Sequence, residues 1–153
     1  MNDEYYINET FKLAKKAKLK GDFPVGALIV KNNKIISKAY NKKEYKQNSI
    51  YHAEILAINK ACKKLKTWHL DNCILYTSME PCLMCYGSII QSHIKKIVYS
   101  AENFSFGAFS GPYGIKNNKM EIKIINNNDY LTTIHNFFNN KRSNVSRETL
   151  EKK

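Results

Sequence analysis

Three residues that bind transition metals occur at a spacing typical of a zinc site: His52, Cys82 and Cys85. The two cysteines are three positions apart, so on a helix their side chains share one face. Pro81 just before them is typical of a helix start. His52 and both cysteines are expected in the first turns of two helices, where the helix dipole lowers the pKa of a thiol. Since zinc prefers nitrogen and sulfur ligands, the sequence predicts two helix N-termini directed at one ion.

Glu54 follows His52 by two positions, which on a helix places the two side chains on different faces. They can share a site only if that site lies off the helix end, an arrangement that suits a histidine ligand beside a glutamate that is not a ligand. Three ligands leave one coordination position for water, and an open position marks a catalytic zinc site rather than a structural one.

The cysteine pair taken alone also allows a redox couple or half of a structural zinc site. A structural site needs a fourth ligand, and Cys62 lies about 15 Å from His52 along the same helix, which is too far. The remaining candidates for a fourth ligand are Cys73, His69 and His93, but none of them lies at a ligand-pair spacing from another metal-binding residue. Cys62 and Cys73 are more simply interpreted as core residues. The combined motif therefore favours the catalytic site.

The elements that position these residues alternate between helices and strands. Hydrophobic periodicity predicts helices at 3–20, 51–65, 82–91 and 129–141, the last capped by Asp129, and strands at 25–30, 35–40, 73–77, 95–99 and 120–125, the last near a sheet edge. This pattern predicts an α/β fold, a three-layer α/β/α sandwich with a central mixed sheet of about five strands. We expect one domain over 1–142, functional loops at 41–49 and 103–118, and a polar tail at 143–153 that frays.

The composition restricts the class of protein. The 153 residues are 43% hydrophobic and contain no apolar run of 18 or more residues, which predicts one packed domain and no membrane span. The N-terminus does not resemble a signal peptide, so a cytoplasmic protein with reduced cysteines is expected. The net charge of +12 is compatible with nucleic-acid binding, although a lysine-rich composition alone would produce it.

The segments His52-Ala53-Glu54 and Pro81-Cys82-Leu83-Met84-Cys85 resemble the signature of the zinc-dependent cytidine/deoxycytidylate deaminase superfamily. The resemblance implies a cytidine deaminase-like fold with one zinc ion per subunit, held by His52, Cys82 and Cys85. It further implies that the ion activates a water molecule toward the ring carbon that bears the amine. Glu54 would then shuttle the water's proton to the ring nitrogen and the leaving ammonia.

Within the superfamily, residues 11–142 are most similar to the bacterial tRNA-specific adenosine deaminases, through 24–27, 52–55, 79–85, 92–94 and 97–99. The resemblance implies conversion of adenosine to inosine at the wobble position of a tRNA anticodon loop by a homodimer. It implies a set of substrate contacts: Asn41, Val25 and the backbone near Ala53 at the purine, and Asn103, Phe137, Phe138, Lys141 and Arg142 at the RNA. Aromatic and basic side chains together are typical of binding to single-stranded RNA, although one of two adjacent phenylalanines usually packs into the core.

The loop after the strand at 95–99 departs from the family pattern, with Asn103 where an aspartate is usual and two phenylalanines nearby. These changes fall in the part that would hold nucleotides flanking the target. Residues 70–78 followed by Glu80-Pro81-Cys82 are also similar to guanine deaminases that act on the free base, which is the alternative substrate. A second class, a zinc module that binds RNA without catalysis, would have no use for Glu54.

Overall fold

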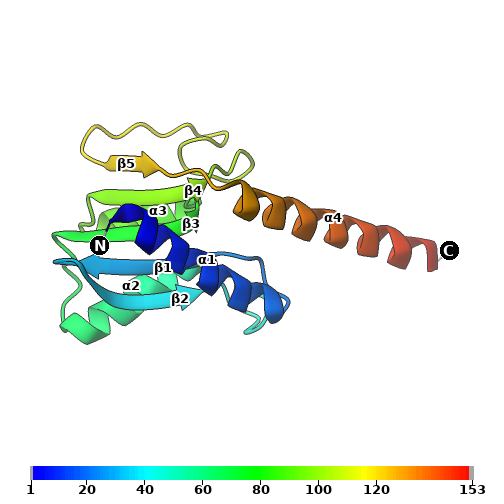
Figure 1. Ribbon diagram of the computed structural model, residues 1–153, viewed down its shortest axis with the longest axis horizontal. Coiled ribbons are helices and arrows are strands. Elements are labelled where there is room, and N and C mark those ends of the chain that lie inside the picture. The colour runs from blue at the N-terminus through cyan, green and yellow to red at the C-terminus, as the bar shows by residue number, and fades with distance from the viewer. Residues whose placement is uncertain (1, 152–153) are drawn as a thin grey trace.

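The computed structural model describes the backbone of residues 2–151 and the side chains of residues 2–142, and this part of the chain forms one sheet flanked by helices (Figure 1). The elements follow in the order α1 (Asp3–Leu19), β1 (Gly26–Lys31), β2 (Lys34–Tyr40), α2 (Ala53–Leu65), β3 (Cys73–Met79), α3 (Leu83–Gln91), β4 (Lys96–Ala101), β5 (Glu121–Ile124) and α4 (Asn128–Glu151). The five strands lie in the order β2-β1-β3-β4-β5. The pairs β2/β1 and β1/β3 are antiparallel, whereas β3/β4 and β4/β5 are parallel. The predicted α/β fold with a mixed sheet is confirmed, and β5 is an edge strand as expected.

Alternate residues of the central strands build two separate cores, because successive side chains point to opposite faces of a sheet. One face packs against α1, which lies in front of the sheet in Figure 1, through Leu28, Val30, Tyr76 and Val98. The other packs against α2 and α3, which lie behind it, through Ala27, Ile29, Leu75 and Ile97. The sheet is therefore covered on both faces, which fixes the starts of α2 and α3 relative to the end of β3.

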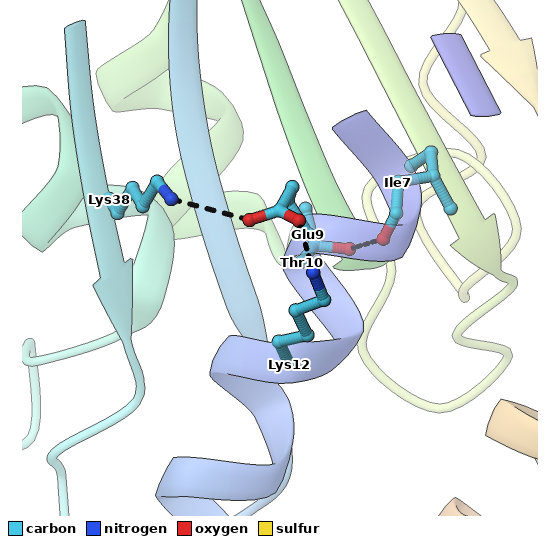
Figure 2. Close-up of polar contacts among 5 residues, drawn as sticks. All are labelled: Ile7, Glu9, Thr10, Lys12 and Lys38. Atoms are coloured by element: carbon cyan, nitrogen blue, oxygen red, sulfur yellow. Dashed lines mark hydrogen bonds and ion pairs between the residues drawn. The ribbon is translucent and has the colours of Figure 1, made fainter. Parts of the chain in front are cut away.

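α1 lies close to the start of β1 because Gly26 has no side chain. A Cβ atom at this position would lie 2.2 Å from the carbonyl oxygen of Thr10 and 2.5 Å from the Cβ of Leu13. The outer side of the same helix is tied to β2 through Glu9, whose carboxylate accepts from Lys12 at 2.6 Å and from Lys38 at 3.3 Å (Figure 2). These contacts hold α1 across the β1–β2 hairpin.

α4 differs from the predicted last helix at both ends. Its first turn is capped by Asn127, whose Oδ1 accepts from the backbone N–H of Tyr130 at 2.9 Å, and not by Asp129, which lies inside that turn. The helix continues to Glu151, so the tail expected at 143–153 is helical as far as it is described, and 152–153 lie outside the described residues. No glycine or proline occurs between 128 and 151 to end the helix. Of the helices in residues 2–151, none is long and apolar enough to cross a membrane.

Candidate active site

His52, Cys82 and Cys85, named here the His-Cys-Cys cluster, meet at the starts of two helices. The Sγ atoms of Cys82 and Cys85 lie 3.6 Å and 3.5 Å from His52 Nδ1. These three donor atoms all lie within 4.8 Å of one another and could hold a metal ion. The structure thus brings together the three residues predicted as ligands.

The two helix starts differ in one detail from the prediction, which placed His52 and Cys82 within the first turns. Both residues are N-caps with extended backbone, His52 at α2 and Cys82 at α3, and neither side chain caps its own helix. An N-cap side chain lies beyond the helix end, so both can turn toward a point between the two helices. The uncapped backbone N–H groups of the first turns add positive potential there, which favours thiolates and anions.

Glu54 lies beside this cluster in the interior of the protein. Its side chain is only 4% exposed, and burial raises the pKa of its carboxyl group. The hydroxyl of Thr77 donates to Oε1 at 3.1 Å, and Cys85 Sγ donates to Oε2 at 3.3 Å. The carboxyl group is therefore held against a predicted ligand, in a place where it can exchange a proton. Nothing in the sequence pattern singled out Thr77.

The two thiols of the cluster differ in their readiness to ionise. The hydrogen bond from Cys85 lowers the pKa of the Cys82 thiol to about 4, while that same bond and burial raise the pKa of Cys85. The hydrogen bond to Cys82 raises the pKa of His52. Two thiols and a buried carboxyl group this close together cannot all be anionic without a compensating cation. The donor set therefore matches a site for a divalent metal ion.

Glu80 organises the loop that follows β4, a role that the sequence analysis missed. Its side chain is 2% exposed. Oε1 accepts from the backbone N–H of Asn103 at 3.2 Å, and Oε2 accepts from those of Phe109 and Ser110 at 2.9 Å each. A Cβ at Gly107 would lie 2.1 Å from Oε2 and 2.4 Å from the carbonyl oxygen of Asn103, and since the second atom belongs to the backbone, only glycine fits there. The available signal was a carboxylate directly before the proline and the first cysteine of the motif.

The same loop carries two exposed aromatic rings. Asn103 Oδ1 accepts from the backbone N–H of Phe106 at 3.0 Å and so closes the turn. Phe104 and Phe106 are 71% and 74% exposed. Asn103 thus shapes this turn with its side chain, in addition to the substrate contact that was predicted for it.

Asn41 and Val25, both predicted at the purine, lie next to each other. The backbone N–H of Asn41 donates to the carbonyl of Val25 at 3.0 Å. The Asn41 amide donates to the carbonyl of Phe23 at 3.4 Å and accepts from the backbone N–H of Lys43 at 3.2 Å. Ala53, the first residue of α2, is fully buried.

The loop at 42–48 is fastened by a buried residue that the sequence analysis did not identify. Asp22 is fully buried, and its two carboxylate oxygens accept from the backbone N–H groups of Glu44 and Tyr45, each at 2.8 Å. The ring of Tyr45 is 49% exposed, and Lys20 Nζ lies 4.5 Å from its centroid. This anchoring presents an aromatic ring and a cation together at the surface.

The predicted RNA contacts of α4 are partly occupied by packing within the protein. The rings of Phe137 and Phe138 lie 5.3 Å and 5.0 Å from the ring of Phe23, and Phe138 is 43% exposed. Lys141 Nζ lies 4.9 Å from the centroid of Phe137. Arg142 is exposed on the same helix. Both phenylalanines therefore pack on Phe23, and Phe138 keeps part of its ring available to a partner.

The sequence model of the MafB19-like deaminase family matches residues 1–142. The tRNA-specific adenosine deaminase of Bacillus subtilis (strain 168) is 48% identical over 99 residues, which cover 65% of this chain and 62% of that protein. The tRNA-specific adenosine deaminase of Aquifex aeolicus (strain VF5) is 42% identical over 115 residues, covering 75% of this chain and 76% of that protein. The chain thus spans less than two thirds of the first relative and about three quarters of the second.

Two solved structures share the fold. A guanine deaminase from Bacillus subtilis is 40% identical, with a TM-score of 0.66, over 70% of this chain and 72% of that one. A structure from work on A-to-I editing by tRNA:A34 deaminases at the wobble position of transfer RNA has a TM-score of 0.75 at 24% identity. It covers 80% of this chain and 98% of the other, and at this identity the likeness concerns the fold alone.

Proposed function

We propose that this chain, which belongs to the tRNA-specific adenosine deaminase family, converts adenosine to inosine by hydrolysis. The proposed target is the adenosine at the wobble position of a tRNA anticodon, and the reaction releases ammonia. The observation that carries the proposal is the contact of the buried Glu54 carboxyl group with Cys85 of the His-Cys-Cys cluster. A site that only held a metal ion would not need a buried carboxyl group beside its ligands. Deamination needs one, because a proton must move from water to the leaving amine.

We propose that the metal ion is zinc, one per chain, held by His52, Cys82 and Cys85. At tetrahedral Zn²⁺, a nitrogen and a sulfur ligand lie about 3.6 Å apart, given typical bond lengths of about 2.05 and 2.3 Å. The distances from His52 Nδ1 to the two sulfur atoms are 3.6 and 3.5 Å, which supports this assignment. When bound at such a site, zinc supplies Lewis-acid chemistry and lowers the pKa of water.

Glu54 is proposed to move the proton. Its carboxylate accepts one proton of the water that attacks C6 of adenine and gives it to the adjacent ring nitrogen. The same carboxylate then accepts the proton of the new hydroxyl group on C6 and gives it to the amino group, which leaves as ammonia when its bond to C6 breaks. Water and adenosine thus yield inosine and ammonia without an additional reactant. The hydroxyl of Thr77 donates to one carboxyl oxygen, which supports a fixed orientation of Glu54 during both transfers.

Asn41 and the backbone near Ala53 are proposed to fix the purine, together with Val25. The two loops at 42–48 and 103–110 are proposed to hold the flanking nucleotides. Their exposed rings Tyr45, Phe104 and Phe106 support a single-stranded substrate, because bases stack on aromatic side chains in such complexes. The net charge of +12 adds attraction for the phosphate backbone.

The test uses zinc-loaded wild-type protein and Glu54→Ala. Each is incubated with an anticodon stem-loop bearing a wobble adenosine and, separately, with free guanine, and inosine and ammonia are quantified. We expect inosine from the stem-loop with wild type only, and an unchanged zinc content in the variant. Ammonia from guanine alone would overturn the substrate and favour the free-base enzyme. Stem-loop binding by both proteins without any ammonia would overturn the enzyme and favour an RNA-binding module.

α4 offers a separate test of the RNA contacts. The substitutions Lys141→Ala and Arg142→Ala together remove two cations, and we expect weaker stem-loop binding with a flatter dependence on salt, by about two in the log–log slope. Zinc content should stay unchanged. Binding measured at several salt concentrations checks this, and an identical slope in the variant would remove α4 from the interface.

We also propose a homodimer and a cytoplasmic location. α3 presents Leu83, Gly87 and Ile90 outward at helical spacing, and Leu83 and Ile90 are 40% and 41% exposed. A small residue between two apolar ones supports close approach of a second copy. Light scattering during size-exclusion chromatography tests the proposal, since Ile90→Asp should shift a dimer of wild type toward monomer.

A further inference from the structure

His69, Asp71 and His93, named here the distal cluster, converge at the surface although neither histidine has a partner at ligand spacing in the sequence. The Nδ1 atoms of His69 and His93 lie 3.4 Å apart. Each Nδ1 also lies 3.7 Å from a different carboxylate oxygen of Asp71. Three donor atoms that metals prefer thus face one point, with side chains that are 45–52% exposed.

The backbone places these side chains before any ion binds. Leu70 and Ile94, the residues directly after the two histidines, are fully buried or nearly so. The backbone N–H of Leu70 donates to the carbonyl of Ser92 at 2.8 Å and joins the turn before β3 to the turn before β4. His93 has a φ of 65°, in the left-handed region that few non-glycine residues adopt. A turn held this way fixes where its ring points.

The indole of Trp68 fixes the orientation of the first imidazole. The rings of Trp68 and His69 stack with centroids 3.6 Å apart and planes at 28°, and His93 meets the same indole edge-on at 5.2 Å. Stacking occupies the face of the His69 ring, so its nitrogen atoms stay available at the ring edge. The plane of the His69 ring is therefore set before an ion binds.

We propose that the distal cluster is a second metal site, which binds a divalent transition-metal ion of the Zn²⁺ class through His69 Nδ1, His93 Nδ1 and Asp71. Two nitrogen ligands of a tetrahedral Zn²⁺ lie about 3.3 Å apart, close to the 3.4 Å between the two imidazoles. The two Asp71 carboxylate oxygens, each 3.7 Å from one imidazole nitrogen, belong to a side chain that is 52% exposed and therefore has room to turn toward an ion. Two neutral imidazoles and one carboxylate leave further positions for water.

The distal cluster is independent of the proposed deamination. The His-Cys-Cys cluster lies at the N-terminal ends of α2 and α3, whereas the distal cluster follows their C-terminal ends. α2 has 13 residues, and a helix of that length spans about 20 Å. No buried carboxyl group corresponding to Glu54 accompanies the distal cluster among the described residues, since Asp71 is itself half exposed. The ion is therefore proposed to link two turns and not to react.

Trp68 supplies the measurement, because it is the only tryptophan of the chain. Ni²⁺ bound within contact of its ring should quench its fluorescence. The experiment titrates Ni²⁺ into untagged protein that carries one zinc ion per chain, at the His-Cys-Cys cluster, and then adds Zn²⁺, which should restore the signal by displacing Ni²⁺. The matched control is His135→Ala, since His135 is an exposed histidine outside both clusters.

We expect saturable quenching in wild type and in the control, and an affinity at least about tenfold weaker in His93→Ala, because loss of even a second-shell partner costs about 10–100-fold. Asp71→Asn keeps the size of the side chain and should also weaken binding. Equilibrium dialysis against Zn²⁺ should give two ions per wild-type chain and one per His93→Ala chain. Equal quenching in wild type and His93→Ala, or one zinc ion per wild-type chain, would overturn the site. A circular dichroism spectrum of each variant, compared with wild type, separates loss of a ligand from loss of the fold.

Discussion

The two clusters at opposite ends of α2 and α3 have similar donor geometry and different surroundings. In the His-Cys-Cys cluster Cys85 is fully buried and contacts the buried Glu54, whereas in the distal cluster each side chain is about half exposed. Two cysteine sulfur atoms and uncapped helix starts accompany the first cluster, and an indole ring accompanies the second. The arrangement of donor atoms is therefore suited to a metal ion in both clusters. Only the His-Cys-Cys cluster, however, has a carboxyl group, that of Glu54, which is shielded from bulk water and can transfer a proton there.

Cys82→Ser should have the largest effect and separate the two clusters. Loss of one of three ligands should remove the catalytic zinc and lower turnover by at least about a hundredfold, beyond the 10–100-fold that second-shell changes cost. Ni²⁺ quenching of Trp68 should be unchanged, because the distal cluster keeps its ligands. Metal analysis and inosine formation check the first expectation. Stoichiometric zinc with full turnover in the variant would show that Cys82 is not a ligand.

Metal removal should also distinguish the two clusters, with the distal cluster losing its ion first. Thiolate ligands in a buried site hold zinc more tightly than two imidazoles and a carboxylate at the surface, so we expect apparent affinities to differ by about a hundredfold or more. The protein is dialysed against chelators of increasing strength, and its metal content and activity are measured after each step. We expect the first ion to leave while turnover is unchanged, and turnover to be lost when the second ion leaves. Loss of activity in step with the first ion would mean that the weaker site is the catalytic one.

Glu80→Gln tests what a buried carboxylate contributes next to the His-Cys-Cys cluster. The amide keeps the size of the side chain but can accept at one oxygen only, so its NH₂ group would face a backbone N–H that now donates to Glu80. Leaving that N–H without an acceptor should cost about 1–3 kcal/mol of the free energy of unfolding. Denaturant unfolding measures it, with zinc content as the control. A variant as stable as wild type would mean that the loop at 103–110 has another anchor.

The elements and the His-Cys-Cys cluster were predictable because their signals are local. Hydrophobic periodicity located all nine elements within a few residues at most ends, and His52, Cys82 and Cys85 stand in short motifs whose spacing carries the chemistry. The helix ends were less predictable. Asn127 rather than Asp129 caps α4, since neighbouring Asn and Asp residues are equally good caps and only the chain path decides between them.

The distal cluster could not be predicted, because its contacts depend on the register of the sheet. His69 and His93 each stand alone in the sequence and were considered only as fourth ligands of the first site. They meet because β3 and β4 are parallel, with Ile74 paired to Lys96, so that the turns before the two strands lie side by side. The roles of Glu80 and Asp22 were not predicted for a related reason. Their hydrogen-bond partners are backbone N–H groups of distant loops, and such groups leave no signal in the sequence.

Glu9→Gln, the same substitution at a partly buried carboxylate whose lysine partners are exposed, should have the smallest effect and provide a reference for the effect at Glu80. The hydrogen bond from Lys12 lowers the pKa of Glu9, so the folded state favours the ionised carboxylate. Its contribution to stability is fully present above the pKa of the unfolded chain and is lost as pH falls through the lower pKa of the folded chain. The variant should therefore melt about 1–3 °C below wild type near neutral pH, with the difference disappearing on acidification and in high salt. Calorimetry of both proteins across this pH range checks the sign, and a gap that widened toward acid pH would show that Glu9 acts through packing and not through its charge.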